Sequence, residues 1–236
     1  MIINHLFSCI SMRTMVRASR KSKGQRSRDP ARTRRRLMET GAALFAERGY
    51  AGVTLERVAS RSRINKAMIR YYFGGKRRFY EAILLELFSR ASARLREAGS
   101  QGRRAPERLA RFVRAMGDLH EEAPHMSAMV LREMLSGGRR LDRSVVPFLG
   151  AILEHLRSIL EQGAREGSLR PVDPFLTHLA LVGATAFFFA TAAARERIIR
   201  TGALPVPVPA PGAYIRHVQD VILRGIVTRP RTERAG

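Results

Sequence analysis

The chain lacks the sequence features of disulfides, metal centres and nucleotide-binding loops. Cys9 is the only cysteine among 236 residues. A disulfide within one chain is therefore excluded, and a reducing, cytoplasmic setting is expected. The sequence also has no Walker-type loop and no dinucleotide-binding fingerprint. We therefore expect neither an enzyme nor a cofactor.

The histidines are placed wrongly for a metal site. His120 and His125 stand five residues apart, and Pro124 breaks any helix between them. Their side chains therefore cannot share the single helix face that a zinc-binding pair needs. His155 and His178 are isolated in the sequence. No metal ligand and no catalytic residue is predicted.

Acidic residues are scarce, above all in the N-terminal third. The chain has 43 Lys and Arg against 20 Asp and Glu, for a formal net charge of +23. Residues 1–78 hold 20 basic and 4 acidic side chains, whereas residues 79–236 hold 23 and 16. A basic field of this kind attracts phosphates through counterion release, so double-stranded DNA is the expected partner. An Arg-rich composition without a DNA-binding role is the alternative for the C-terminal tail.

The sequence lacks the pattern of a β-sheet. No segment alternates apolar and polar residues between turn signals, whereas apolar residues at helical spacing recur with Gly or Pro at their ends. An all-α fold is therefore predicted. The first helix is expected at residues 34–48. Further helices are expected at 77–98, 106–121, 125–136, 144–166, 174–199 and 212–228.

The segment between Thr54 and Lys76 has the pattern of a helix-turn-helix. It reads as a short helix, a tight turn and a second short helix, with basic residues on one face and Ile69 and Phe73 on the other. The amphipathic helix at 34–48 precedes it and ends before Gly49. Together the three helices predict a compact DNA-reading head.

This stretch resembles the TetR family of bacterial transcriptional repressors over about residues 32–86. The resemblance lies in the aromatic–glycine end of the first helix, the caps of the next two helices and the aromatic end of the third. The matching residues are Phe45, Gly49, Tyr50, Thr54, Ala59, Ile64, Asn65, Ile69, Tyr72, Phe73 and Lys76. Arg63 departs from the pattern, because the family usually has Gly at this turn. Either the turn differs or the chain tolerates a strain of about 1 kcal/mol.

The head supplies the predicted DNA-binding residues. Asn65 is expected to cap the recognition helix, which leaves Lys66, Ala67, Arg70 and Tyr71 on its exposed side. Arg70 stands where the family often has Tyr, and an Arg there suits the O6 and N7 atoms of guanine. The resemblance further implies phosphate contacts from Thr54, Tyr72 and Lys76. Each of these residues has an alternative structural role, as a cap, a packed ring or a solvated charge.

The ends of the chain differ from the middle. Residues 1–31 are expected to be a basic, disordered arm that either enters the minor groove of DNA or is a solvated tail. Met1, Met12 and Met15 are alternative start sites, and a secretory signal is not expected. The head is assigned to residues 32–78, a helical effector-binding and dimerisation domain to 79–228, and a disordered tail to 229–236.

One segment is apolar enough to raise the question of a membrane. Residues 174–194 contain no charged side chain over 21 positions. Thr and His interrupt the segment, and Asp173 followed by Pro174 is a helix start, so we expect a buried or interfacial helix and no membrane partner. Ala186, Ala190 and Ala194 recur every four residues. This helix and the one at 212–228 are therefore predicted to form a four-helix homodimer interface.

The family resemblance implies a pocket for a small effector in the body. Met and Phe form adaptable apolar walls, so an apolar or amphipathic molecule is expected, with ordinary core packing as the alternative for each residue. The candidates are Phe112, Met116, Met126, Met129, Met134 and Phe188. The function predicted from the sequence is a dimeric repressor that such an effector releases from a palindromic operator. A nonspecific nucleoid-type DNA-binding protein is the alternative.

Overall fold

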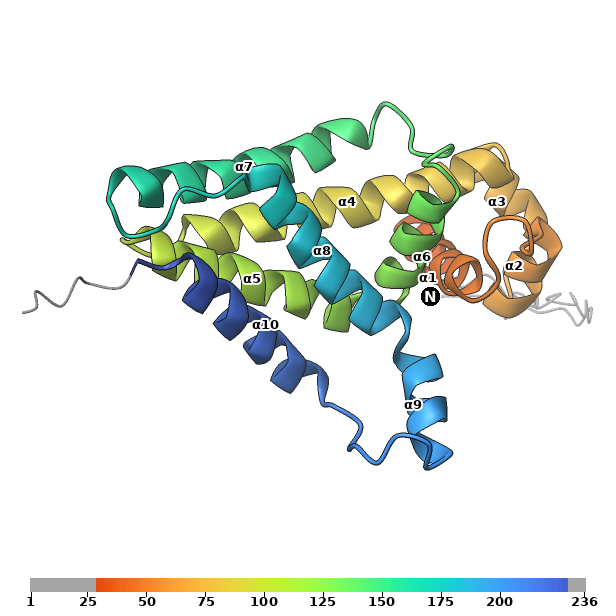
Figure 1. Ribbon diagram of the computed structural model, residues 1–236. Coiled ribbons are helices and arrows are strands. Elements are labelled where there is room, and N and C mark those ends of the chain that lie inside the picture. Colours follow the sequence, from red (N-terminus) through yellow and green to blue (C-terminus); the bar gives the residue numbers. More distant parts are fainter. Residues whose placement is uncertain (1–28, 229–236) are drawn as a thin grey trace, which may run out of the picture.

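The computed structural model describes residues 29–228, and every regular element of more than one residue in this range is a helix (Figure 1). The predicted all-α fold is therefore confirmed. The helices are α1 (Pro30–Arg48), α2 (Leu55–Ser62), α3 (Lys66–Phe73), α4 (Lys76–Ser100), α5 (Ala105–Glu122), α6 (Pro124–Leu135), α7 (Val146–Arg165), α8 (Pro174–Ala190), α9 (Ala192–Arg200) and α10 (Pro211–Ile226).

The three helices of the head lie together at one end of the molecule (Figure 1). The carboxylate of Asp29 caps α1 by accepting a hydrogen bond of 3.0 Å from the backbone N–H of Ala31. The helix therefore begins four residues earlier than its apolar pattern predicted, because Asp29 and Pro30 supply a cap and a first turn. Gly49, with φ of +69°, ends it. Residues 1–28 of the predicted N-terminal arm and the predicted tail at residues 229–236 lie outside the described range.

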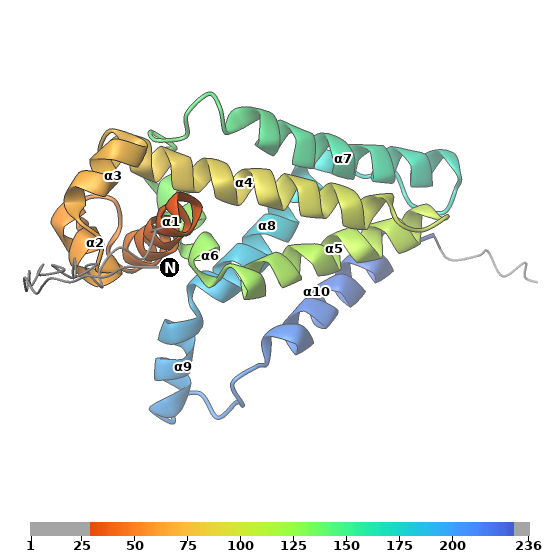
Figure 2. The same cartoon turned by 180° about the vertical axis from the view of Figure 1, so that it is seen from behind.

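Helix α4 connects the head to the body. Its first turn lies beside α3, and the helix then runs along the length of the body next to α5 and α7 (Figures 1 and 2). The body core lies between these helices, with α8 and α10 packed against α5. The core around the head extends beyond residues 32–78, because Met129 and Val145 are buried in the same cluster as Phe45 and Ile69. Head and body therefore share packed side chains.

The prediction of one continuous helix over residues 174–199 was wrong. Asp173 caps α8 as predicted, with its carboxylate accepting from the N–H of Leu176 at 2.7 Å. The helix then breaks at Thr191, and the axis of α9 bends away by 57°. The Thr191 hydroxyl donates to the carbonyl of Phe187 at 2.7 Å, a backbone contact that favours bending. Among the described residues no single helix meets the length and hydropathy criteria for a membrane span, although α8 and α9 meet them as a bent pair.

Candidate DNA-binding head and its link to the body

The turn of the head keeps a left-handed geometry although it lacks glycine. Thr54 caps α2, its hydroxyl accepting from the N–H of Arg57 at 3.2 Å. At the other end of α2, Arg63 has φ of 54° and ψ of 35°. A side chain in this conformation costs on the order of 1 kcal/mol relative to Gly. The head therefore tolerates strain at the turn that joins its two short helices.

The recognition helix α3 is oriented by its buried residues. Asn65 caps it as predicted, with its side-chain oxygen accepting from the N–H of Ala67 at 2.8 Å. Ile69 and Phe73 are buried in the core of the head. The opposite side therefore presents Arg70 and Tyr71 to solvent, and the Tyr71 side chain is 78% exposed. An exposed cation beside an exposed aromatic ring suits contact with base edges in a major groove.

Lys66 is not a free cation. Its ammonium group lies 2.7 Å from a carboxylate oxygen of Glu56 on α2. This hydrogen bond from Lys66 is the main reason why the pKa of Glu56 falls to about 2. Sequence reasoning missed Glu56, since the pair spans the turn between two helices and no periodic spacing connects its members. Arg70, which has no such partner among the described contacts, is thereby the stronger candidate for reading a base.

The predicted phosphate contacts lie on three different helices, with Thr54 at the start of α2, Tyr72 near the end of α3 and Lys76 at the start of α4. Lys76 is the first residue of α4, and its ammonium nitrogen lies 4.4 Å from the centre of the Tyr50 ring. Burial is the main cause that lowers the pKa of Lys76, and the nearby charge of Arg140 lowers it further. No side chain caps this helix start, so its first N–H groups and Lys76 together suit an anion such as a phosphate. Tyr72 is half-buried, and Thr54 is exposed.

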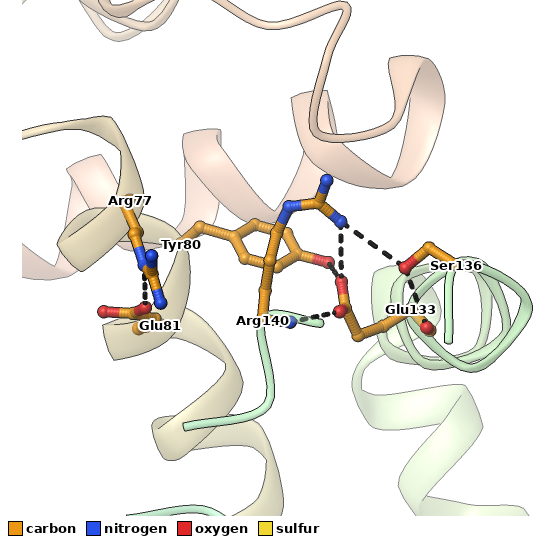
Figure 3. Close-up of polar contacts among 6 residues, drawn as sticks. All are labelled: Arg77, Tyr80, Glu81, Glu133, Ser136 and Arg140. Carbon is orange, nitrogen blue, oxygen red and sulfur yellow. Dashed lines mark hydrogen bonds and ion pairs between the residues drawn. The ribbon is translucent and has the colours of Figure 1, made fainter. Parts of the chain in front are cut away.

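A buried carboxylate joins the body to the head (Figure 3). Glu133 on α6 is 1% exposed. It accepts hydrogen bonds from the Tyr80 hydroxyl of α4 at 3.0 Å and from the backbone N–H of Arg140 at 2.7 Å. The Arg140 guanidinium lies 3.4 Å from the same carboxylate and 4.2 Å from the centre of the Tyr50 ring. A shift of α6 would therefore act on α4 and on Tyr50 together.

A second contact runs from α6 to the first helix of the head. The Arg132 side chain donates from Nε to the backbone carbonyl of Ala46 at 3.2 Å. Tyr50, which follows α1, also packs against Tyr80, with ring centres 5.2 Å apart. No spacing in the sequence predicts these contacts, because the residues are separated by 30 to 86 positions. Helix α6 therefore contacts the end of α1 through Arg132 and the start of α4 through Glu133.

The predicted effector-pocket residues come together only in part. Phe112, Met116 and Met126 are buried in the body core. Phe188 is buried outside this cluster, with its ring stacked at 3.8 Å on that of Tyr214, which packs against the cluster. Two further candidates lie elsewhere. Met129 is buried in the cluster around the head. Met134 is exposed near the end of α6 and is removed from the predicted pocket, because it does not face the body core.

Polar groups lie among these apolar side chains. His120 is buried, and its Nδ1 lies 2.6 Å from the Ser127 hydroxyl. Burial lowers the pKa of His120 to about 4, so the ring is neutral at pH 7. Arg195 lies with its guanidinium carbon 3.9 Å from the centre of the Phe188 ring, and its buried Nε has no hydrogen-bond partner among the described residues. An open surface hollow of about 370 Å³ lies elsewhere, at the end of α10.

The predicted dimer residues do not share one exposed face. Ala186 is buried inside the protomer, so it is unavailable to a second subunit and is removed from the predicted interface. Ala190 is half-buried and Ala194 is exposed. The solvent-facing side of α8 instead carries large apolar side chains. These residues are Phe175, Leu176, Leu179 and Phe187.

A capped basic recognition helix, held in a three-helix head on an all-helical body, defines a DNA-binding regulator of the helix-turn-helix class. Two family models match the chain and together cover more than half of it. They are "Bacterial regulatory proteins, tetR family" over residues 37–83 and "Tetracyclin repressor-like, C-terminal domain" over residues 106–204. The chain belongs to the TetR family of transcriptional regulators.

Curated relatives match over nearly the whole chain. The HTH-type transcriptional regulator RutR of Escherichia coli K12 is 25% identical over 92% of this chain and 100% of its own length. The HTH-type transcriptional repressor NicS of Pseudomonas putida is 26% identical over 86% of this chain and 96% of its own. These names describe regulators of transcription rather than enzymes.

Solved structures show the same fold. The ketosteroid transcriptional regulator KstR2 of Mycobacterium tuberculosis has a TM-score of 0.67 at 21% identity, and the match covers 83% of this chain and 95% of that one. FadR of Bacillus subtilis, solved in complex with stearoyl-CoA, has a TM-score of 0.65 at 17% identity, with 81% and 98% covered. At these identities the likeness concerns the fold alone.

Proposed function

We propose that this regulator is a cytoplasmic homodimeric repressor that binds an inverted-repeat operator and is released from it by a small amphipathic effector. The observation that carries the proposal is the buried Glu133 carboxylate, which binds Tyr80 of α4 and Arg140 beside Tyr50. A movement of α6 would thereby act on α4 and on Tyr50. A protein that only coats DNA would need no such connection between its body and its head.

Two features support a dimer. A single α3 offers only Ala67, Arg70 and Tyr71 as exposed candidates for base contact, which is a small surface for operator-level affinity. Two-fold symmetry doubles this surface and explains why an inverted repeat is expected. The exposed apolar side of α8, with Phe175 and Phe187, supplies the face that a second copy would cover.

The chemistry of the body supports an amphipathic effector. Phe112 and Met116 are apolar side chains of the body core, and Phe188 is buried against Tyr214, which packs on that core. His120 stacks on Phe189, and Arg195 covers Phe188, so polar groups accompany the apolar ones. The unpartnered Nε of Arg195 is a hydrogen-bond donor, so the effector is expected to carry an acceptor. One structural neighbour was solved with stearoyl-CoA, which joins an acyl chain to a polar group.

The experiment is a footprint on the DNA that flanks the protein's own gene, followed by light scattering on the purified chain. We expect one protected inverted repeat and a dimer at micromolar concentration. Protection without sequence preference would favour the nucleoid-type alternative. A panel of amphipathic molecules is then added to the complex, and the binder is expected to lower operator affinity. By linkage the operator must weaken binding of that molecule by the same factor.

A further inference from the structure

Helix α9 and the segment that follows it project from the body (Figures 1 and 2). Among the described helices, α9 alone has no buried residue. All residues from 201 to 208 are exposed as well. We refer to residues 192–210 as the arm, which is a different segment from the N-terminal arm predicted at residues 1–31. A segment this exposed contributes little to the core of its own protomer.

The arm nevertheless carries apolar side chains into solvent. Thirteen large apolar side chains are exposed in the described part of the chain, and nine of them lie between residues 175 and 221. Four of the nine belong to the arm, namely Ile198, Leu204, Val206 and Val208. Several large apolar side chains exposed within one short segment mark a site of interaction with another molecule.

The backbone of the arm is stiff. Proline occupies every second position from Pro205 to Pro211. Proline fixes φ and lacks an N–H donor, so this stretch cannot pair as an ordinary strand and loses little freedom when it docks. The arm is therefore preorganised to present Val206 and Val208 to a partner surface.

The base of the arm is fixed on the body. Arg195 donates from Nη1 to the carbonyl of Phe188 at 2.8 Å. Its guanidinium also covers the Phe188 ring, which stacks on Tyr214 of α10. The start of the arm is thus attached to α8 and α10, the two helices whose outer faces we assign to the dimer.

The arm follows directly on the helix whose exposed side we assign to the dimer. That side of α8 runs through Phe175, Leu179 and Phe187 at spacings that are multiples of four, and the arm begins five residues after Phe187. We propose that the arm packs on the second copy of the chain, so that each subunit is held by the arm of the other in addition to the helix faces. This inference rests on the proposed function, because it requires the homodimer.

The test measures how tightly two copies associate when an acidic charge is placed on the arm. Val206→Asp and Ile198→Asp are compared with Val146→Asp by sedimentation equilibrium. Val146 is the matched control, because it is 56% exposed against 52% for Val206 and lies at the start of α7, away from the arm. Both arm variants are expected to raise the dimer dissociation constant at least about tenfold. The control is expected to leave it unchanged.

A second measurement uses the chain with its other residues intact. A photoreactive amino acid at position 206 is expected to give a covalent dimer after irradiation, and one at position 146 only monomer. The role of the arm would be overturned if the arm variants left the dimer dissociation constant unchanged and position 206 gave no crosslink. The repressor proposal would then remain intact. A wild-type chain that is monomeric when it binds its operator would overturn both. Helix content by circular dichroism should be unchanged in all variants, since the arm has no buried residue.

Discussion

The Tyr80 hydroxyl donates a hydrogen bond of 3.0 Å to the Glu133 carboxylate, joining residues 53 positions apart at the boundary between head and body (Figure 3). The pair is buried, and its environment raises the pKa of Tyr80, chiefly through desolvation and then through the nearby Glu133 charge. The hydroxyl therefore stays protonated and remains a hydrogen-bond donor in the physiological pH range.

Removing this carboxylate should destabilise the fold. Glu133→Ala leaves the Tyr80 hydroxyl and the Arg140 N–H without their partner, and we expect a loss of roughly 2–4 kcal/mol in the free energy of unfolding. Urea denaturation measures it. Glu154→Ala is the control, because its pair with Arg157 is exposed and should contribute below about 0.5 kcal/mol. Equal effects of the two substitutions would contradict the role of Glu133.

The strained turn should be relieved by glycine. Arg63→Gly removes the Cβ atom from a left-handed position and should stabilise the protein by about 0.5–1 kcal/mol. Thermal melts at fixed pH measure the change. Ser60→Gly, inside α2, should instead destabilise by up to about 1 kcal/mol, because glycine disfavours a regular helix. A loss of stability in the Arg63 variant would mean that its side chain makes a contact that outweighs the strain.

Arg70 and Lys76 should differ in how they act on DNA. Arg70→Ala is expected to cost roughly 1–3 kcal/mol on the operator and to relax preference at one base pair in each half-site. Lys76→Ala should weaken all sequences alike and reduce the salt dependence by about one unit per head. Binding to single-base operator variants across a salt series measures both effects. If Arg70→Ala weakens every base variant equally, Arg70 contacts the backbone and specificity lies with Lys66, Ala67 or Tyr71.

Glu56 should restrain the charge of the reading head. Glu56→Gln frees the Lys66 ammonium for phosphate, and we expect several-fold tighter binding to operator and unrelated DNA alike at low salt. Fluorescence anisotropy with two labelled duplexes measures this. Glu154→Gln removes the same charge from α7, far from the head in sequence, and should have a much smaller effect. An unchanged affinity in the Glu56 variant would show that the pair persists on DNA in another form.

His120 should make stability fall in mild acid. Burial holds its pKa at about 4, whereas an unfolded His titrates near 6.5. Between these values the unfolded state binds more protons, so the free energy of unfolding falls as the pH is lowered from about 6.5 to 4, by as much as roughly 3 kcal/mol. His120→Gln should lose this part of the pH dependence, and His217→Gln, on the exposed side of α10, should retain it. Urea denaturation at pH 7 and pH 4.5 measures the free energy of unfolding of both variants.

The sequence by itself determined the local features of the head. Thr54, Asn65 and Asp173 cap helices where they were predicted to, because a cap depends on a side chain and on N–H groups within three residues of it. The burial of Ile69 and Phe73 also followed from spacing along one short helix. These are interactions between near neighbours in the chain, so the order of the residues is enough to specify them.

Only the tertiary structure decided which side of α8 faces water. That helix is apolar all round, so its pattern could not distinguish buried Ala186 from exposed Phe187. The Glu56–Lys66 and Glu133–Tyr80 pairs likewise depend on how separate helices pack. A carboxylate is assigned to a partner in another helix by its position in space, and that position is set by the burial of many apolar side chains at once.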